Sequence, residues 1–138
     1  MKNTRIIIAI TGILLPYLAR LPLGSAWVSQ YTDISFVGIL FFGVFNAIAW
    51  GSILAISFLF HRPSSLIFPC VFGFAFLAWA HYTLDLSADA QSAISLVIIP
   101  IYALLPITFG GVLGFVLDRY LGRQDKAAEQ GRSRATGE

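Results

Sequence analysis

The chain has 138 residues, of which 57% are hydrophobic and 12% are charged, and its formal net charge is +2. About a quarter of the residues in a soluble domain are charged, so this composition excludes an ordinary water-soluble globule. The small net charge does not suggest a nucleic-acid partner, because the basic residues form a tail and a few flanking positions and no basic face. The one cysteine, Cys70, excludes an internal disulfide.

Long uncharged runs predict helices that cross a membrane, since crossing the hydrocarbon core takes about 20 apolar residues. Residues 34–60 and 90–117 contain no Asp, Glu, Lys or Arg, and residues 63–84 contain one histidine and none of these four. The prediction is an all-α, polytopic membrane protein: a four-transmembrane-helix bundle with short loops and a polar C-terminal tail. The predicted helices cover about residues 5–23, 34–60, 66–84 and 92–117.

The first predicted helix contains Pro16, which removes the hydrogen bond to the Gly12 carbonyl and predicts a kink. Arg20 lies roughly 22 Å along the helix from Arg5, so its guanidinium is expected to snorkel to the far headgroups. Arg20 and Pro22 are unfavourable in a cleaved signal peptide. We therefore expect this segment to be retained as a helix.

The connections predicted between helices are short. Residues 24–33 form a loop whose Trp27 and Tyr31 suit the aromatic belt at a membrane interface. Residues 61–65 form a tight turn that offers a serine to cap the next helix, and residues 85–89 form the last turn.

The membrane domain is predicted to cover residues 1–123. Residues 118–138 carry five basic and four acidic side chains. We expect residues 124–138 to be a disordered cytoplasmic tail.

The distribution of lysine and arginine predicts the orientation. Cytoplasmic loops are enriched in these residues, and an even number of crossings puts both termini on one side. With both termini in the cytoplasm, only Arg20 lies outside. The remaining basic residues then lie inside: Lys2, Arg5, Arg62, Arg119, Arg123, Lys126, Arg132 and Arg134.

Small residues recur on one face of two predicted helices. Such residues let helix backbones approach closely where the hydrophobic effect is absent. Packing inside the bundle is the favoured interpretation, and an interface between subunits is the alternative. The residues are Gly43, Ala47, Gly51, Ala55, Gly110 and Gly114.

Two polar side chains, Asn46 and Tyr102, are predicted at mid-depth in the membrane. An asparagine in hydrocarbon needs a partner, so Asn46 should face protein. A structural hydrogen bond between helices is the favoured role, and the lining of a permeation path is the alternative.

Ionisable residues gather at the predicted outer end, namely Arg20, His81, Asp85 and Asp89. His81 and Asp85 are four residues apart and could touch. Interfacial anchoring with a surface ion pair is the favoured interpretation, and a binding site or proton relay is the alternative.

Catalytic and metal-binding patterns are missing from the sequence. Gly-x-Ser-x-Gly, phosphate-binding glycine loops and His-Glu-x-x-His do not occur. His61 and His81 fall at opposite sides of the predicted membrane, so no metal site is expected. We therefore expect no enzymatic activity, no metal and no cofactor.

Residues 87–94, Ser-Ala-Asp-Ala-Gln-Ser-Ala-Ile, followed by residues 99–102, Ile-Pro-Ile-Tyr, resemble a stretch of small bacterial inner-membrane proteins of unassigned function. The resemblance implies a bacterial inner membrane and no particular activity.

Small multidrug exporters and dimeric fluoride channels are similar in size. The exporters carry a glutamate deep in their first helix, where this chain has only Arg20. The pair Phe45 and Asn46 resembles the asparagine and phenylalanines near the pore of the fluoride channels, but the other channel motifs are missing. We therefore expect neither drug export nor fluoride conduction.

Two functional hypotheses remain. The first is a non-enzymatic inner-membrane protein that binds another membrane protein, as an accessory subunit or an immunity-type protein. The alternative is an oligomeric small-solute or ion transporter or channel, with the lipid bilayer and a second copy of the chain as partners.

Overall fold

The structure, a computed structural model, describes residues 1–33, 35–88 and 91–136, with side chains as far as Arg132. Within these residues the chain forms five α-helices and two short 3-10 helices, with no strand, and the predicted all-α fold is confirmed. The elements in chain order are α1 (Lys2–Leu18), η1 (Leu21–Leu23), α2 (Ser25–Thr32), α3 (Phe36–Ile56), η2 (Pro63–Leu66), α4 (Ile67–Thr83) and α5 (Ser92–Thr136).

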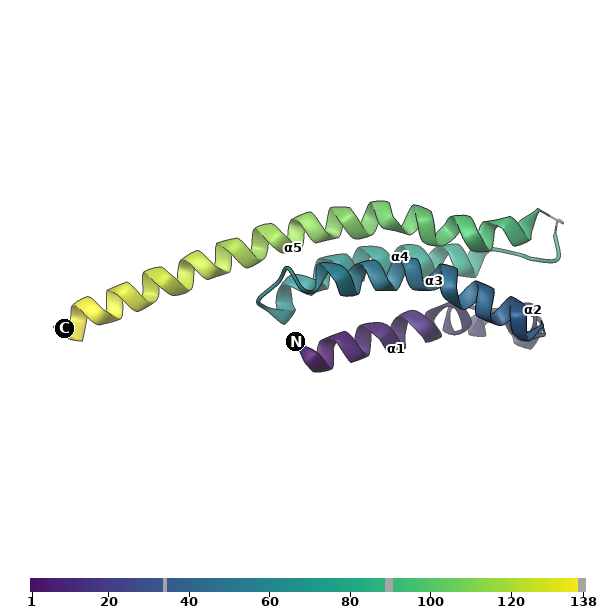
Figure 1. The fold of residues 1–138 in the computed structure, drawn as a ribbon, viewed down its shortest axis with the longest axis horizontal. Helices are drawn as coiled ribbons and strands as arrows, with labels where there is room; N and C mark the ends of the chain where they lie inside the picture. Colours follow the sequence, from purple (N-terminus) through teal and green to yellow (C-terminus); the bar gives the residue numbers. More distant parts are fainter. Residues whose placement is uncertain (34, 89–90, 137–138) are drawn as a thin grey trace.

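Four helical stretches are long and apolar enough to cross a membrane, as expected of a membrane protein. They run side by side as a bundle (Figure 1). Large apolar side chains cover the outside of the bundle, and Phe36 and Leu105 are each 73% exposed. An apolar exterior of this kind suits lipid and is unfavourable in water. The stretches are Lys2–Leu23, Phe36–Ile56, Pro63–Thr83 and Ser92–Arg132.

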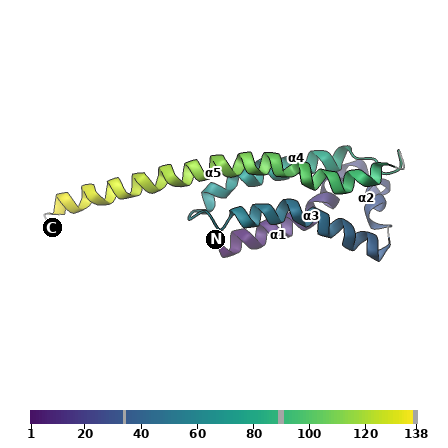
Figure 2. The ribbon, with the colours of Figure 1, turned by 45° about the horizontal axis from the view of Figure 1, so that its top comes forward.

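The C-terminal part of α5 departs from the prediction. Disorder was predicted from residue 124, whereas the helix continues to Thr136 and projects beyond the other helices (Figures 1 and 2). Residues 124–130 are Gln, Asp, Lys, Ala, Ala, Glu and Gln. All of them except the aspartate have high helix propensity, so the polar composition that indicated a loose tail is equally that of an exposed helix.

Two connections also differ from the predicted ones. The predicted loop at residues 24–33 holds the short helix α2, which begins after Gly24, whose φ of 97° favours glycine. Helix α3 ends at Ile56, before the predicted residue 60, and Arg62 is extended because a proline follows it. No serine caps α4, whose N-cap is Leu66.

Helices α4 and α5 pack closely because glycines line their contact. A Cβ on Gly110 would lie 2.7 Å from the Phe68 carbonyl carbon, and one on Gly73 would lie 2.5 Å from Ile107 Cγ1. A Cβ on Gly114 would overlap the Ser65 carbonyl oxygen. Gly110 and Gly114 therefore let two backbones meet, which is how small residues hold membrane helices together.

Candidate functional site

Asn46 joins α3 to α1 where Pro16 interrupts the hydrogen bonds of α1. Pro16 has no backbone N–H, so the Gly12 carbonyl lacks the donor it would have in a regular helix. The Asn46 Nδ2 donates to the Gly12 oxygen at 2.9 Å, and the Asn46 side chain is almost fully buried. Trp50, one turn further along α3, lies where any Cβ on Gly12 would collide with it. The asparagine thus supplies the donor that the proline removes.

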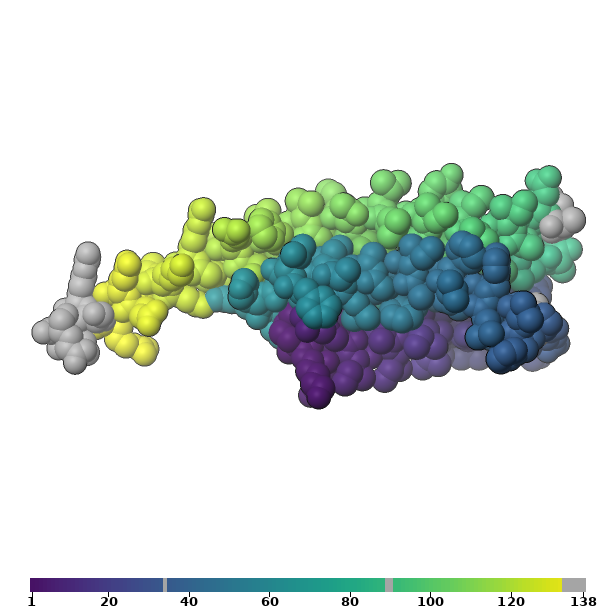
Figure 3. All heavy atoms as spheres, in the orientation of Figure 1, coloured from purple at the N-terminus to yellow at the C-terminus, as the bar shows by residue number. Residues whose placement is uncertain are grey.

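A groove of about 370 Å³ opens beside this bond, between α1 and α3, which lie side by side on the face drawn in Figure 3. Its lining includes Tyr17 from α1, and Phe42, Gly43 and Asn46 from α3. The Asn46 Oδ1 is buried, and no residue in the described part of the chain donates to it. The groove therefore has an apolar lining, to which the buried Asn46 oxygen contributes no accessible acceptor.

The predicted small-residue stripe of α3 lies on the outer side of the bundle. Gly43 and Ala55 are exposed, and Ala47 and Gly51 are half-buried. No atom lies within 4 Å of the place where a Cβ on Gly43 or Gly51 would be. The packing inside the bundle that was expected of these four residues is therefore not found. Helix α3 is apolar on all sides, so its sequence does not mark its inner face.

Tyr102 is separate from Asn46. It is 60% exposed on the outside of α5, so the structure does not bring the two predicted mid-depth polar side chains together. A tyrosine on the outer surface can keep its ring in an apolar environment while its hydroxyl finds a polar partner there.

Arg20 belongs to the cluster of ionisable residues predicted at the outer end of the bundle. Its side chain is fully buried instead of reaching lipid headgroups. Its Nε donates to the His81 carbonyl at 3.1 Å, and its Nη1 donates to the Trp27 carbonyl at 2.8 Å. Its Nη2 donates to the Leu84 carbonyl. The guanidinium also lies over the Tyr31 ring, 3.7 Å from its centroid. The chain turns at η1 and folds α2 over Arg20, so protein carbonyls replace the headgroups.

His81 contacts Tyr31 instead of forming the predicted ion pair with Asp85. The Tyr31 hydroxyl and the His81 Nδ1 are 2.9 Å apart, and both side chains are buried. The His81 Nε2 is buried, with no hydrogen-bond partner among the described residues. Burial raises the pKa of Tyr31 to about 12, so its phenol stays protonated at neutral pH.

Asp85 is linked to Arg20 through Gln30. The Gln30 Oε1 accepts from Arg20 at 2.9 Å, and its Nε2 donates to Asp85 at 2.9 Å. The Ser87 hydroxyl and backbone N–H also donate to Asp85. These donors hold the pKa of Asp85 below its ordinary value, with Ser87 as the largest cause and Gln30 next. Asp89, the fourth predicted member, lies outside the described residues.

A second polar cluster, which the sequence analysis missed, lies at the end of the bundle that holds the N-terminus. Asp118 accepts hydrogen bonds from the Ser65 hydroxyl at 2.9 Å and from the backbone N–H groups of His61 and Arg62. The His61 Nδ1 lies 3.3 Å from the same carboxylate. Asp118 is the first charged residue after the long uncharged run, and that position was the available signal.

The polar clusters around Arg20 and Asp118 consist of hydrogen bonds between elements of the bundle. In the part of the chain that the structure describes, no three His, Cys, Asp or Glu side chains gather so as to hold a metal ion.

Comparison of the chain with protein-family models, with curated proteins and with solved structures finds no match.

Proposed function

We propose that this chain is a non-enzymatic protein of the bacterial inner membrane that binds a transmembrane helix of another membrane protein. The groove between α1 and α3 is the proposed binding site. Both termini then lie in the cytoplasm. The positions of Arg5, Arg62, Arg119 and Lys126 at or beyond one end of the bundle, with Arg20 at the other, support this orientation.

One observation carries the proposal: the groove leaves free space above Gly43 that no neighbouring helix in the described part of the chain fills. In lipid, helices associate through close backbone approach and hydrogen bonds, because apolar burial between them brings little gain. Gly43 and Ala47 allow the close approach. None of the chain's own helices, as far as the structure describes them, packs against this part of α3.

Site-specific photo-crosslinking in native membranes tests this proposal. A photo-reactive amino acid at Leu40 or Val44, which line the groove, should give one shared protein adduct. The same group at Leu105 or Val116 of α5, which are 73% and 60% exposed, should not give that adduct. Gly43→Leu fills the groove and should abolish the adduct.

Two results would count against the proposal. Identical adducts from the groove and control positions would show that contacts on this surface are unspecific. An adduct with the mass of two copies of this chain would favour the oligomeric transporter instead. The mass of the detergent-purified protein then separates the helix-binding protein from the oligomeric transporter, because a strict monomer cannot provide a pathway between subunits.

A further inference from the structure

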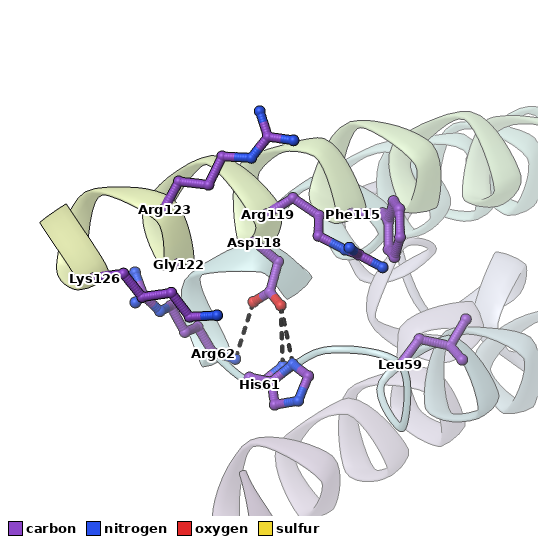
Figure 4. Close-up of a pocket in the computed structure, with 9 residues that line it drawn as sticks. All are labelled: Leu59, His61, Arg62, Phe115, Asp118, Arg119, Gly122, Arg123 and Lys126. Atoms are coloured by element: carbon purple, nitrogen blue, oxygen red, sulfur yellow. Dashed lines mark hydrogen bonds and ion pairs between the residues drawn. The ribbon is translucent and has the colours of Figure 1, made fainter.

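A cavity of about 490 Å³ lies between the loop after α3 and the middle of α5, at the end of the bundle that holds the N-terminus (Figure 4). His61 and Arg62 line it from the loop, and Arg119 and Lys126 line it from α5. Figure 4 shows Arg62 and Lys126 on one side of Asp118, with Arg119 extending toward Phe115 on the other.

The cavity carries an excess of positive charge. Its lining holds Arg62, Arg119, Arg123 and Lys126 against a single carboxylate, that of Asp118. Asp118 already accepts from His61, Arg62 and Ser65, and the Arg62 guanidinium pairs with Asp125 just outside the lining.

Three of the cationic side chains have no described acidic partner, although the Arg119 guanidinium lies over the Phe115 ring, 4.9 Å from its centroid. Across the described residues, no carboxylate pairs with Arg119, Arg123 or Lys126. A cleft lined mainly by positive charges attracts anions.

The cavity continues into an apolar groove of about 260 Å³ between α3 and α5. Leu59 and Phe115 line both the cavity and the groove, so the two spaces are adjacent. Ile56 and Val112 carry the apolar lining further into the bundle. A single ligand that fills both spaces must therefore be anionic at one end and apolar along the other.

We infer that this composite site binds an anionic phospholipid of the cytoplasmic leaflet, with its headgroup in the cavity lined by Arg119, Arg123 and Lys126 and one acyl chain in the groove lined by Leu59 and Phe115. Basic pockets between helices on the cytoplasmic side suit such headgroups. The site shares no lining residue with the helix-binding groove, so the inference depends on the membrane location and orientation and not on the proposed partner.

Native mass spectrometry of the detergent-purified full chain tests this inference. Phosphatidylglycerol should bind with clear preference over phosphatidylcholine of identical acyl chains. Inorganic phosphate and glycerol 3-phosphate at equal concentration should give no comparable binding, because neither fills the apolar groove. Equal binding of the two lipids, or equal binding of free phosphate, would overturn the inference.

A pair of charge variants locates the site. Lys126→Gln removes one cation from the cavity, and the loss of about 1 kcal/mol per basic residue near an anionic surface corresponds to a roughly fivefold weaker affinity for phosphatidylglycerol. Lys2→Gln removes one exposed cation outside the lining and should leave the affinity within twofold. Equal weakening by both variants would show only general electrostatic attraction and would contradict the site. Circular dichroism confirms that each variant keeps its helices.

Discussion

Asn46 and Pro16 should be energetically coupled because one supplies the hydrogen bond that the other removes. Asn46→Leu keeps a side chain of similar size and leaves the Gly12 carbonyl without a partner. A hydrogen bond between membrane helices contributes about 0.6 kcal/mol on average and up to about 1.7. The substitution leaves the Gly12 carbonyl unpaired but also removes the buried, unpaired Asn46 Oδ1, so we expect Asn46→Leu to lower the free energy of unfolding by about 1 kcal/mol.

In Pro16→Ala protein the same substitution should cost less. Alanine restores a backbone N–H that can donate to the Gly12 carbonyl four residues earlier, so Asn46→Leu should then cost about 0.5 kcal/mol or less. The four proteins form a double-mutant cycle with a coupling energy of about 0.5–1 kcal/mol. The other effects of Pro16→Ala cancel in the cycle.

The assay is reversible unfolding by SDS in mixed micelles, followed by tryptophan fluorescence and helical circular dichroism. Trp50, one of the three tryptophans, packs against Gly12 and contributes to this signal. Ser52→Ala is the matched control, because the Ser52 hydroxyl donates only within α3, to the Ala49 carbonyl. An equal cost of Asn46→Leu in both backgrounds would refute the reasoning.

Three further predictions use the same unfolding assay. Arg20→Met should lower the free energy of unfolding by about 3 kcal/mol, because the buried His81 carbonyl and the partly buried Trp27 and Leu84 carbonyls lose a charged donor. Gly110→Val should cost about 1–3 kcal/mol through overpacking against α4, whereas Gly43→Val should change the free energy by less than about 0.5 kcal/mol. The lowered pKa of Asp85 means that its carboxylate adds stability above the ordinary aspartate pKa and loses this effect as pH falls through the lowered value. The stability difference between wild type and Asp85→Asn should therefore be present at pH 6 and vanish in acid.

Each of these predictions has a contrary outcome. An Arg20→Met protein as stable as wild type would mean that water or lipid satisfies the freed carbonyls. If Gly110→Val and Gly43→Val lowered the free energy of unfolding equally, small residues inside and outside the bundle would not differ in their contribution to packing. A difference between wild type and Asp85→Asn that grows as pH falls would reverse the sign of the linkage.

The helical architecture was predictable because crossing lipid demands long uncharged stretches, and these are visible as residues 34–60 and 90–117. The inward side of each helix was not predictable in the same way. On α3, lipid and protein interior are equally apolar, so the small-residue stripe gave no sign that it lies outside.

The polar contacts were partly predictable. Pro16 identified a carbonyl without a donor, and Asn46 needed a partner, but the pairing of the two depends on how α1 crosses α3. The inward turn of Arg20 depends on α2, which places the Trp27 carbonyl and Gln30 around the guanidinium. Propensity alone does not predict an eight-residue helix folded over a buried cation.

The central claim is that four helices cross the bilayer with both termini on the cytoplasmic side, since both proposed sites depend on it. Single cysteines at Lys2, Ser87 and Gln130 in a Cys70→Ala chain, treated with a membrane-impermeant maleimide, test it directly. In intact cells only the cysteine at Ser87 should react, and the other two should react after permeabilisation. Labelling of the cysteines at Lys2 and Gln130 from opposite sides, or of all three from one side, would contradict the account.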